Sequence, residues 1–143
     1  RRSRNHLSAG RARRRRLPPG VAMSVGMPVY LYLIQYGARC AAVFGPDVYH
    51  VGSSLKRKRG WRDVDVRAML SDDDWIAWGF GTAPDECPHG AQWESVVMAF
   101  SALGQHMTGL PIDFQVQPTT WANKQFQTEA GCVRSRIGGR GIP

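Results

Sequence analysis

Residues 48–66 read VYHVGSSLKRKRGWRDVDV, and this stretch decides the fold that the sequence predicts. Its first four residues favour a short strand that ends in the glycine-serine turn at 52–54. A basic segment follows at 56–62, and then acids alternate with valines from residue 63 onward. Because a period of two is typical of a strand with one buried face, we expect a second strand over 63–70.

The segments on either side of this stretch alternate between helical and strand patterns. Apolar residues at helical spacing predict helices before it and after it, and the period-two pattern returns near residue 113. Ser71, followed by three aspartates, is a typical helix start, and Gly109 a typical helix end. The predicted fold is α+β, a small mixed β-sheet flanked by helices. The predicted helices are 30–44, 71–79, 91–107 and 119–127, the further strand is 112–116, and the helix at 91–107 is expected to turn Trp93, Val96, Val97, Phe100 and Leu103 to one side.

The candidate chemistry begins with the turn and the first pair of acids. Glycine lets the backbone approach a ligand closely, and the amides and hydroxyls of Gly52, Ser53 and Ser54 are suited to phosphate oxygens. Asp63 and Asp65 are two residues apart on a strand, so their carboxylates project from one face. A divalent cation relieves the repulsion of such a pair, and Mg²⁺ prefers carboxylate oxygens together with waters and phosphates.

A third acid, Asp113, is flanked by apolar residues in the stretch 110–114. A carboxylate in such surroundings requires a partner, and a metal ion shared with the first pair is one candidate. Each feature also has an ordinary structural interpretation. The glycine-serine segment occurs in simple turns, the acid pair is compatible with a solvated strand face, and Asp113 is compatible with a strand-edge acid or a partner of a helix cap.

Taken together, the motifs resemble those of the DNA polymerase beta-type nucleotidyltransferase superfamily. That family has an apolar strand that ends in Gly-Gly or Gly-Ser, a spacer, a strand of alternating acids and apolar residues, and a later third acid between apolar residues. The present chain reads Val51-Gly52-Ser53, a spacer of nine residues, Asp63-Val64-Asp65-Val66, and later Ile112-Asp113-Phe114. The resemblance extends over residues 28–128, although only the short motifs are specific.

The resemblance implies a function for each motif. Gly52 and Ser53 would hold the triphosphate of an NTP such as ATP, and Asp63, Asp65 and Asp113 would be the catalytic and metal-binding residues. Two Mg²⁺ ions would assist the attack of an acceptor hydroxyl on the α-phosphorus, and pyrophosphate would leave. Independently of the resemblance, Arg67 follows the strand acids on the same face, within reach of a phosphate.

The charge of the chain is concentrated in its first residues. Of the 143 residues, the first 20 hold eight arginines and no acid, whereas the remainder holds eleven basic and eleven acidic residues. We expect residues 1–27 to be a disordered tail, the domain to span 28–128, and residues 129–143 to form a loose C-terminal segment. The tail is either an arm for nucleic acid or no part of the natural protein. The basic segment 56–62 either contacts nucleic acid or phosphate, or is a solvated loop.

Three widely spaced cysteines do not suggest a disulfide framework, so the default expectation is a cytoplasmic protein with reduced thiols and no membrane span. Cys87 and His89 lack a second ligand pair and are interpreted as loop residues. The predicted function is Mg²⁺-dependent nucleotidyl transfer to an acceptor that is a small molecule, RNA or protein. Two alternatives stay open: a catalytically idle protein of the same fold that binds a nucleotide or partner, and a nucleic-acid-binding module that uses the Arg-rich tail.

Overall fold

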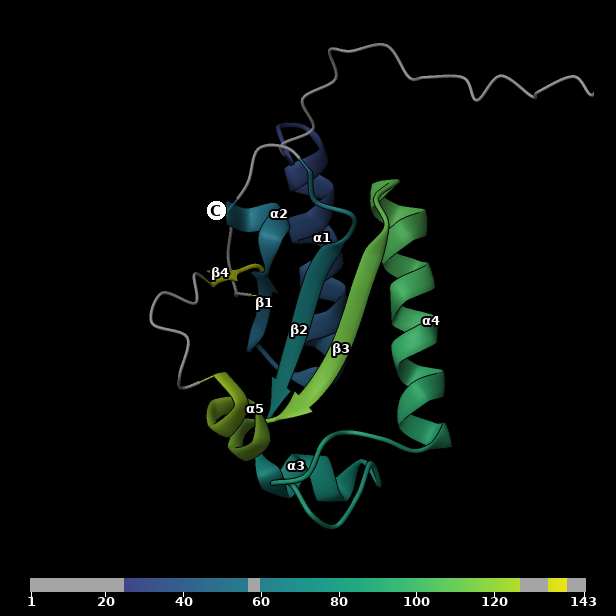
Figure 1. The fold of residues 1–143 in the computed structure, drawn as a ribbon. Helices are drawn as coiled ribbons and strands as arrows, with labels where there is room; N and C mark the ends of the chain where they lie inside the picture. The colour runs from purple at the N-terminus through teal and green to yellow at the C-terminus, as the bar shows by residue number, and fades with distance from the viewer. Residues whose placement is uncertain (1–24, 57–59, 127–133, 139–143) are drawn as a thin grey trace, which may run out of the picture.

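Two long helices packed on a mixed β-sheet form most of the structure, a computed structural model that describes residues 25–56, 60–126 and 134–138 (Figure 1). The α+β class predicted from the sequence is confirmed. The helices are α1 (Val29–Phe44), α2 (Ser53–Lys56), α3 (Asp72–Ala77), α4 (Ala91–Thr108) and α5 (Thr119–Phe126), and the strands are β1 (Val48–Val51), β2 (Val64–Leu70), β3 (Ile112–Pro118) and β4 (Ser135–Arg136).

The described strands form one sheet in the order β3-β2-β1-β4. Strand β2 pairs in parallel with β3 and antiparallel with β1, and β4 pairs antiparallel with the other edge of β1. The parallel pairing requires a long crossover between β2 and β3, and the chain provides it with α3, a loop and α4. Two strands separated by the 41 residues 71–111 thereby become neighbours in the sheet.

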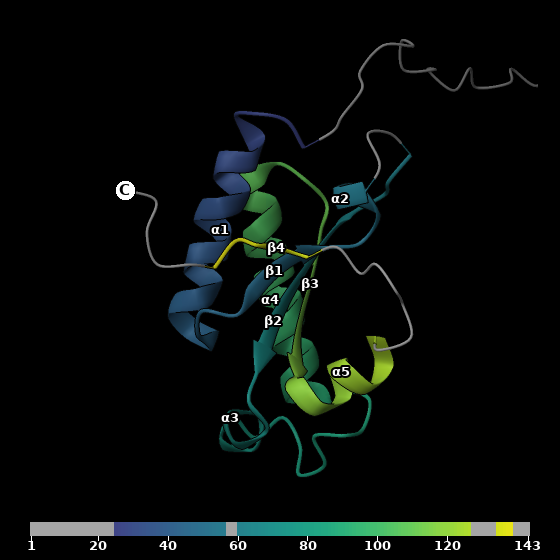
Figure 2. The ribbon, with the colours of Figure 1, turned by 90° about the vertical axis from the view of Figure 1, so that its left-hand side faces the viewer.

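The two faces of the sheet differ in character. Helices α1 and α4 cover one face, while α5 lies toward the other side at the end of β3 (Figure 2). Alternate residues of β2, from Val64 to Leu70, are buried against the helices, and the residues between them are half-buried on the opposite face. Strand β3 shows the same alternation up to Val116. Asp65, Arg67 and Asp113 therefore share the face that α1 and α4 leave uncovered.

Local capping signals explain several helix boundaries. The Ser71 side chain accepts a hydrogen bond from the backbone N–H of Asp74, as the predicted cap requires. Gly109 ends α4 in the left-handed conformation, with φ of 70°, where glycine meets no steric penalty. Both helix ends were expected from the sequence, and they agree with the structure to within two residues.

The buried side of α4 differs from the prediction at Leu103 and at Val97, which is half-buried but is not among the residues packed against the core. Leu103 is 38% exposed, whereas its neighbour Gly104 is buried. A Cβ at Gly104 would lie 2.8 Å from Cζ of Tyr36, so the absence of a side chain lets α1 approach α4 closely. The side chains of α4 that do pack against the core are Trp93, Val96, Phe100 and Met107. Leu103 is displaced from this face because the helices meet at Gly104, a residue that hydrophobicity alone does not select.

The ends of the chain also differ in part from expectation. Residues 134–138, expected in a loose segment, include β4, and Ile137 is 3% exposed in the core. Val25, expected at the end of the tail, packs against the core. The Arg-rich tail through residue 24, positions 57–59 of the basic segment, and residues 127–133 and 139–143 lie outside the described residues.

Candidate functional site

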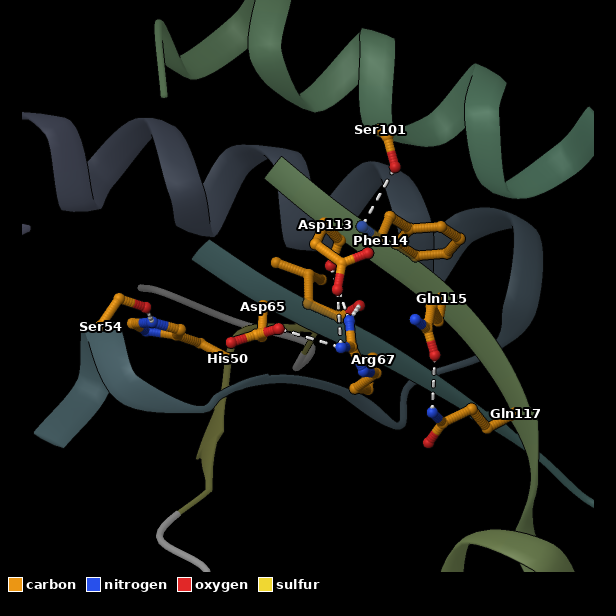
Figure 3. Close-up of polar contacts among 10 residues, drawn as sticks. His50, Ser54, Asp65, Arg67, Ser101, Asp113, Phe114, Gln115 and Gln117 are labelled. Atoms are coloured by element: carbon orange, nitrogen blue, oxygen red, sulfur yellow. Dashed lines mark hydrogen bonds and ion pairs between the residues drawn. The ribbon is translucent and has the colours of Figure 1, made fainter. Parts of the chain in front are cut away.

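The register between β2 and β3 brings together two acids that are far apart in sequence. Asp65 and Asp113 are directly paired across the parallel strands. Both side chains project from the face away from α1 and α4 and point toward the same guanidinium (Figure 3). The prediction that Asp113 joins the first acid pair is therefore confirmed for Asp65.

Arg67 links the two carboxylates. Its Nη2 lies 3.0 Å from Oδ1 of Asp65 and 2.9 Å from Oδ2 of Asp113. Its Nη1 donates to the backbone carbonyls of Val66, at 3.1 Å, and Asp113, at 2.7 Å. The Arg67 side chain is 15% exposed, so water screens these interactions less than it would screen a surface ion pair.

The ionised form of Asp65 is disfavoured despite this arginine. Burial raises the pKa of the Asp65 carboxyl above its ordinary value, and the charges of Asp113 and Asp63 add to the increase. Arg67 acts in the opposite direction, but the net direction is upward. The surroundings of Asp65 therefore favour its neutral form, chiefly because the carboxyl is buried.

Gly52 forms the wall of the site beside Asp65. Its φ is 79°, in the region that favours glycine, and a Cβ added there would collide with Oδ2 of Asp65. The other carboxylate oxygen of Asp65, Oδ1, is the one that accepts from Arg67. The turn that the sequence assigned to phosphate therefore lies directly against the carboxylate assigned to metal.

The two serines after Gly52 have different surroundings. Ser53 begins α2 and is half-buried, whereas Ser54 is 6% exposed and its Oγ lies 2.8 Å from Nε2 of His50. His50 is 1% exposed, and burial lowers the pKa of its imidazole. The Ser54 hydroxyl is thus engaged inside the fold with a histidine on the helix-covered side of the sheet. Of the two serines, Ser53 is the better candidate for a ligand contact.

Asp63 directly precedes β2 and is half-buried. Its charge reaches Asp65 and raises the pKa of that carboxyl. Within the part of the chain that the structure describes, however, no group of three or more His, Cys, Asp or Glu side chains is arranged to hold a metal ion. The carboxylate oxygens suit Mg²⁺ in chemical type, but Arg67 lies where Asp65 and Asp113 would share an ion.

Sequence reasoning missed a pair of amides next to these acids. Gln115 and Gln117 continue along β3 from Asp113, and Nε2 of Gln117 donates to Oε1 of Gln115 at 3.1 Å (Figure 3). The alternation that singled out Asp113 also places Gln115 on the same face, so the signal was present in the pattern. Gln115 is half-buried on the same face as Asp113, whereas Gln117 is 2% exposed, so only Gln115 extends the polar face along β3.

Cys87 and His89 lie in the loop between α3 and α4, as expected. The Nδ1–H of His89 donates to the carbonyl of Cys87 at 2.8 Å, because a carbonyl oxygen only accepts. Both residues line a cavity of about 170 Å³ beside Trp75 and Phe80. The described residues around this loop do not include a metal-binding group.

Comparison with known proteins found no match: no family model, curated protein or solved structure is significantly similar to the chain. Among the described residues, the helices are either too short or too polar to span a membrane. Function must therefore be argued from the geometry around Asp65.

Proposed function

We propose that the chain is a Mg²⁺-dependent nucleotidyltransferase that moves a nucleoside monophosphate from an NTP to a hydroxyl acceptor. The observation that carries the proposal is the meeting of three separated motifs at one point. The turn at Gly52 contacts Asp65, and Asp65 is paired with Asp113 across the parallel strands. Asp65 therefore contacts the turn through one carboxylate oxygen and is linked to Asp113 by Arg67 through the other.

Each side chain has a role in this reaction. Backbone amides at Gly52 and Ser53 bind the triphosphate, and the positive φ of Gly52 keeps that turn free of a Cβ. Asp63 and Asp65 are the carboxylates that hold Mg²⁺, and Asp113 takes the proton of the acceptor hydroxyl. Mg²⁺, when bound, stabilises the charge that develops on the phosphate oxygens. The acceptor oxygen bonds to the α-phosphorus, the bond to the bridging oxygen breaks, and pyrophosphate leaves.

The acceptor approaches from the open face of the sheet. Helices α1 and α4 block the opposite face, and Asp113 projects away from them. The acceptor is a small molecule, RNA or protein, and the NTP is ATP or another nucleoside triphosphate. Gln115 lies one side-chain position beyond Asp113 on the same face and would be among the first residues to meet the acceptor.

A transfer assay with α-labelled NTPs tests the proposal. The label should pass to small-molecule, RNA or protein acceptors with release of pyrophosphate, and it should require Mg²⁺. Asp65→Asn and Asp113→Asn should each reduce transfer at least about 100-fold, because charge stabilisation and positioning supply most of the catalysis. Asp73→Asn, on the exposed side of α3, is the matched control and should retain full activity.

One observation favours a catalytically idle protein of the same fold as the second candidate. Arg67 already bridges Asp65 and Asp113, and an internal cation of this kind can stabilise the acids without any catalysis. Such a protein would be stabilised against heat by an NTP but would not release pyrophosphate. The third expectation, nucleic-acid binding through the Arg-rich tail, concerns residues outside the described ranges.

A further inference from the structure

The guanidinium of Arg67 is held by four hydrogen bonds that come from two strands. Nη2 donates to the carboxylates of Asp65 and Asp113, and Nη1 donates to the carbonyls of Val66 and Asp113. Each terminal nitrogen of arginine carries two hydrogens, so all four terminal N–H groups are used. The side chain is therefore fixed in place from β2 and β3 together.

This arrangement is costly to undo. Withdrawal of Arg67 would leave the carboxylates of Asp65 and Asp113 without their shared counter-ion, and it would remove one partner from each of two strand carbonyls. The Asp65 side chain is only 19% exposed, and an uncompensated charge in such a position costs more than a surface ion pair contributes. Arg67 is therefore a permanent part of the site rather than a side chain that swings in and out.

The guanidinium also occupies the place where an ion shared by Asp65 and Asp113 would bind. It contacts Oδ1 of Asp65 and Oδ2 of Asp113, which leaves Oδ2 of Asp65 facing the Gly52 turn. A divalent cation between the same two oxygens would overlap the guanidinium and be repelled by its charge. Oδ2 of Asp65, on the side of the Gly52 turn, is not the oxygen that Arg67 contacts.

We propose that Arg67 takes the place of one of the two divalent cations, so that this site binds a single Mg²⁺ between Asp63, Asp65 and the triphosphate. The inference rests on the proposed nucleotidyl transfer and replaces the two ions that the family resemblance implies with one. Arg67 is a positioning residue in this arrangement. It holds the carboxylate of Asp113 toward the acceptor and supplies fixed positive charge where the second ion would otherwise lie.

Counting bound Mn²⁺ tests the inference without any turnover. Mn²⁺ replaces Mg²⁺ at oxygen-rich sites and can be counted by electron paramagnetic resonance. The protein is titrated with Mn²⁺ in the presence of the α,β-methylene analogues of ATP, GTP, CTP and UTP, with the nucleotide-bound ion corrected by a protein-free titration. Wild type should bind one ion per chain. Arg67→Ala should bind one ion more than wild type, because it opens the space between Asp65 and Asp113.

Two further variants serve as controls. Arg39→Ala removes the same charge from an exposed position on α1 and should leave the count at the wild-type value. Arg67→Lys keeps the positive charge and should also bind no additional ion. If Arg67→Ala does not fold, the wild-type count and the Arg67→Lys count still decide the matter, since two ions in either protein would overturn the inference.

The outcomes separate the inference from the proposed function. Two ions in wild type would overturn the inference and support two-metal transfer. One ion in both wild type and Arg67→Ala would also overturn it, because the arginine would then exclude nothing. A wild type that binds no ion with any analogue would overturn the proposed function. If wild type binds no ion but Arg67→Ala binds one, the result would still support Arg67 as the occupant of a cation position. If neither protein binds an ion, that role of Arg67 would be overturned.

Discussion

Gly52 lies so close to Oδ2 of Asp65 that no side chain fits between the turn and the carboxylate. Gly52 directly follows β1, which pairs antiparallel with β2 so that Val51 lies opposite Asp65. The close approach explains why glycine is needed at this position. A positive φ and the lack of a Cβ are required at the same time.

Gly52→Ala should therefore impair both folding and transfer. The methyl group would be strained by the positive φ and would collide with Asp65, for a loss of about 2–3 kcal/mol in the free energy of unfolding. Gly109→Ala is the matched control, since its φ of 70° is similar but a Cβ there would meet open space. It should cost only about 1 kcal/mol. Equal losses in urea unfolding would show that the contact with Asp65 is unimportant.

The two serines after Gly52 should respond differently to removal of the hydroxyl. Ser54→Ala leaves Nε2 of the buried His50 without its partner and should lower the free energy of unfolding by about 1–2 kcal/mol. Ser53→Ala should leave stability within about 0.5 kcal/mol and weaken Mg²⁺-NTP binding instead. Calorimetry of unfolding and of NTP binding on both variants distinguishes the roles. Weaker binding with unchanged stability in Ser54→Ala would contradict the structural assignment of its hydroxyl.

Asp65 should make stability depend on pH in the direction opposite to a typical ion-paired acid. Its pKa is raised in the folded protein, chiefly by burial, so folding favours the protonated carboxyl. The protonated Asp65 carboxyl contributes fully to the free energy of unfolding below the pKa of the unfolded state, and this contribution is lost as the pH rises through the pKa of the folded state. The amide of Asp65→Asn does not ionise, so the variant does not lose stability in this way. The melting temperature of the variant relative to wild type should therefore rise between about pH 4 and pH 7 without Mg²⁺.

Bound Mg²⁺ should reverse the comparison at neutral pH, because the ion and NTP stabilise only the ionised carboxylate of the wild type. A melting difference between wild type and Asp65→Asn that stays constant over this pH range would contradict the raised pKa. A difference that falls as the pH rises would indicate that Arg67 dominates over burial. Asp73→Asn changes an exposed carboxyl in the first turn of α3 and provides the reference for general charge effects.

Asp63→Asn should abolish transfer without destabilising the metal-free protein. Asp63 raises the pKa of Asp65 through charge repulsion, so removal of its charge relieves part of that repulsion. The metal-free variant should melt at or above the wild-type temperature, whereas the stabilisation by Mg²⁺ and NTP should be lost. Melting curves with and without both ligands, beside a pyrophosphate assay, check this. The prediction would be contradicted if the variant had a lower melting temperature than wild type both with and without the ligands. If wild type also never released pyrophosphate, only the interpretation as a catalytically idle protein would remain.

Much of the secondary structure could be predicted from the sequence because it depends on local interactions. The alternation in 63–70 predicted β2 and its two faces, since successive side chains of a strand point in opposite directions. Ser71 and Gly109 marked helix ends because a cap is satisfied by groups within one turn. The same alternation identified Asp65 and Asp113 as single acids on strands with one buried face.

The contacts between distant residues were decided only by the tertiary structure. The parallel register that pairs Asp65 with Asp113 depends on how α3 and α4 return the chain to the sheet, and local pattern does not set that distance. The place of Arg67 between two carboxylates and two carbonyls depends on both strands at once. Pairing of β4 with β1 and the engagement of Ser54 by His50 likewise needed the assembled fold. The sequence alone determined which residues carry charge and which face they share, whereas packing decided their partners.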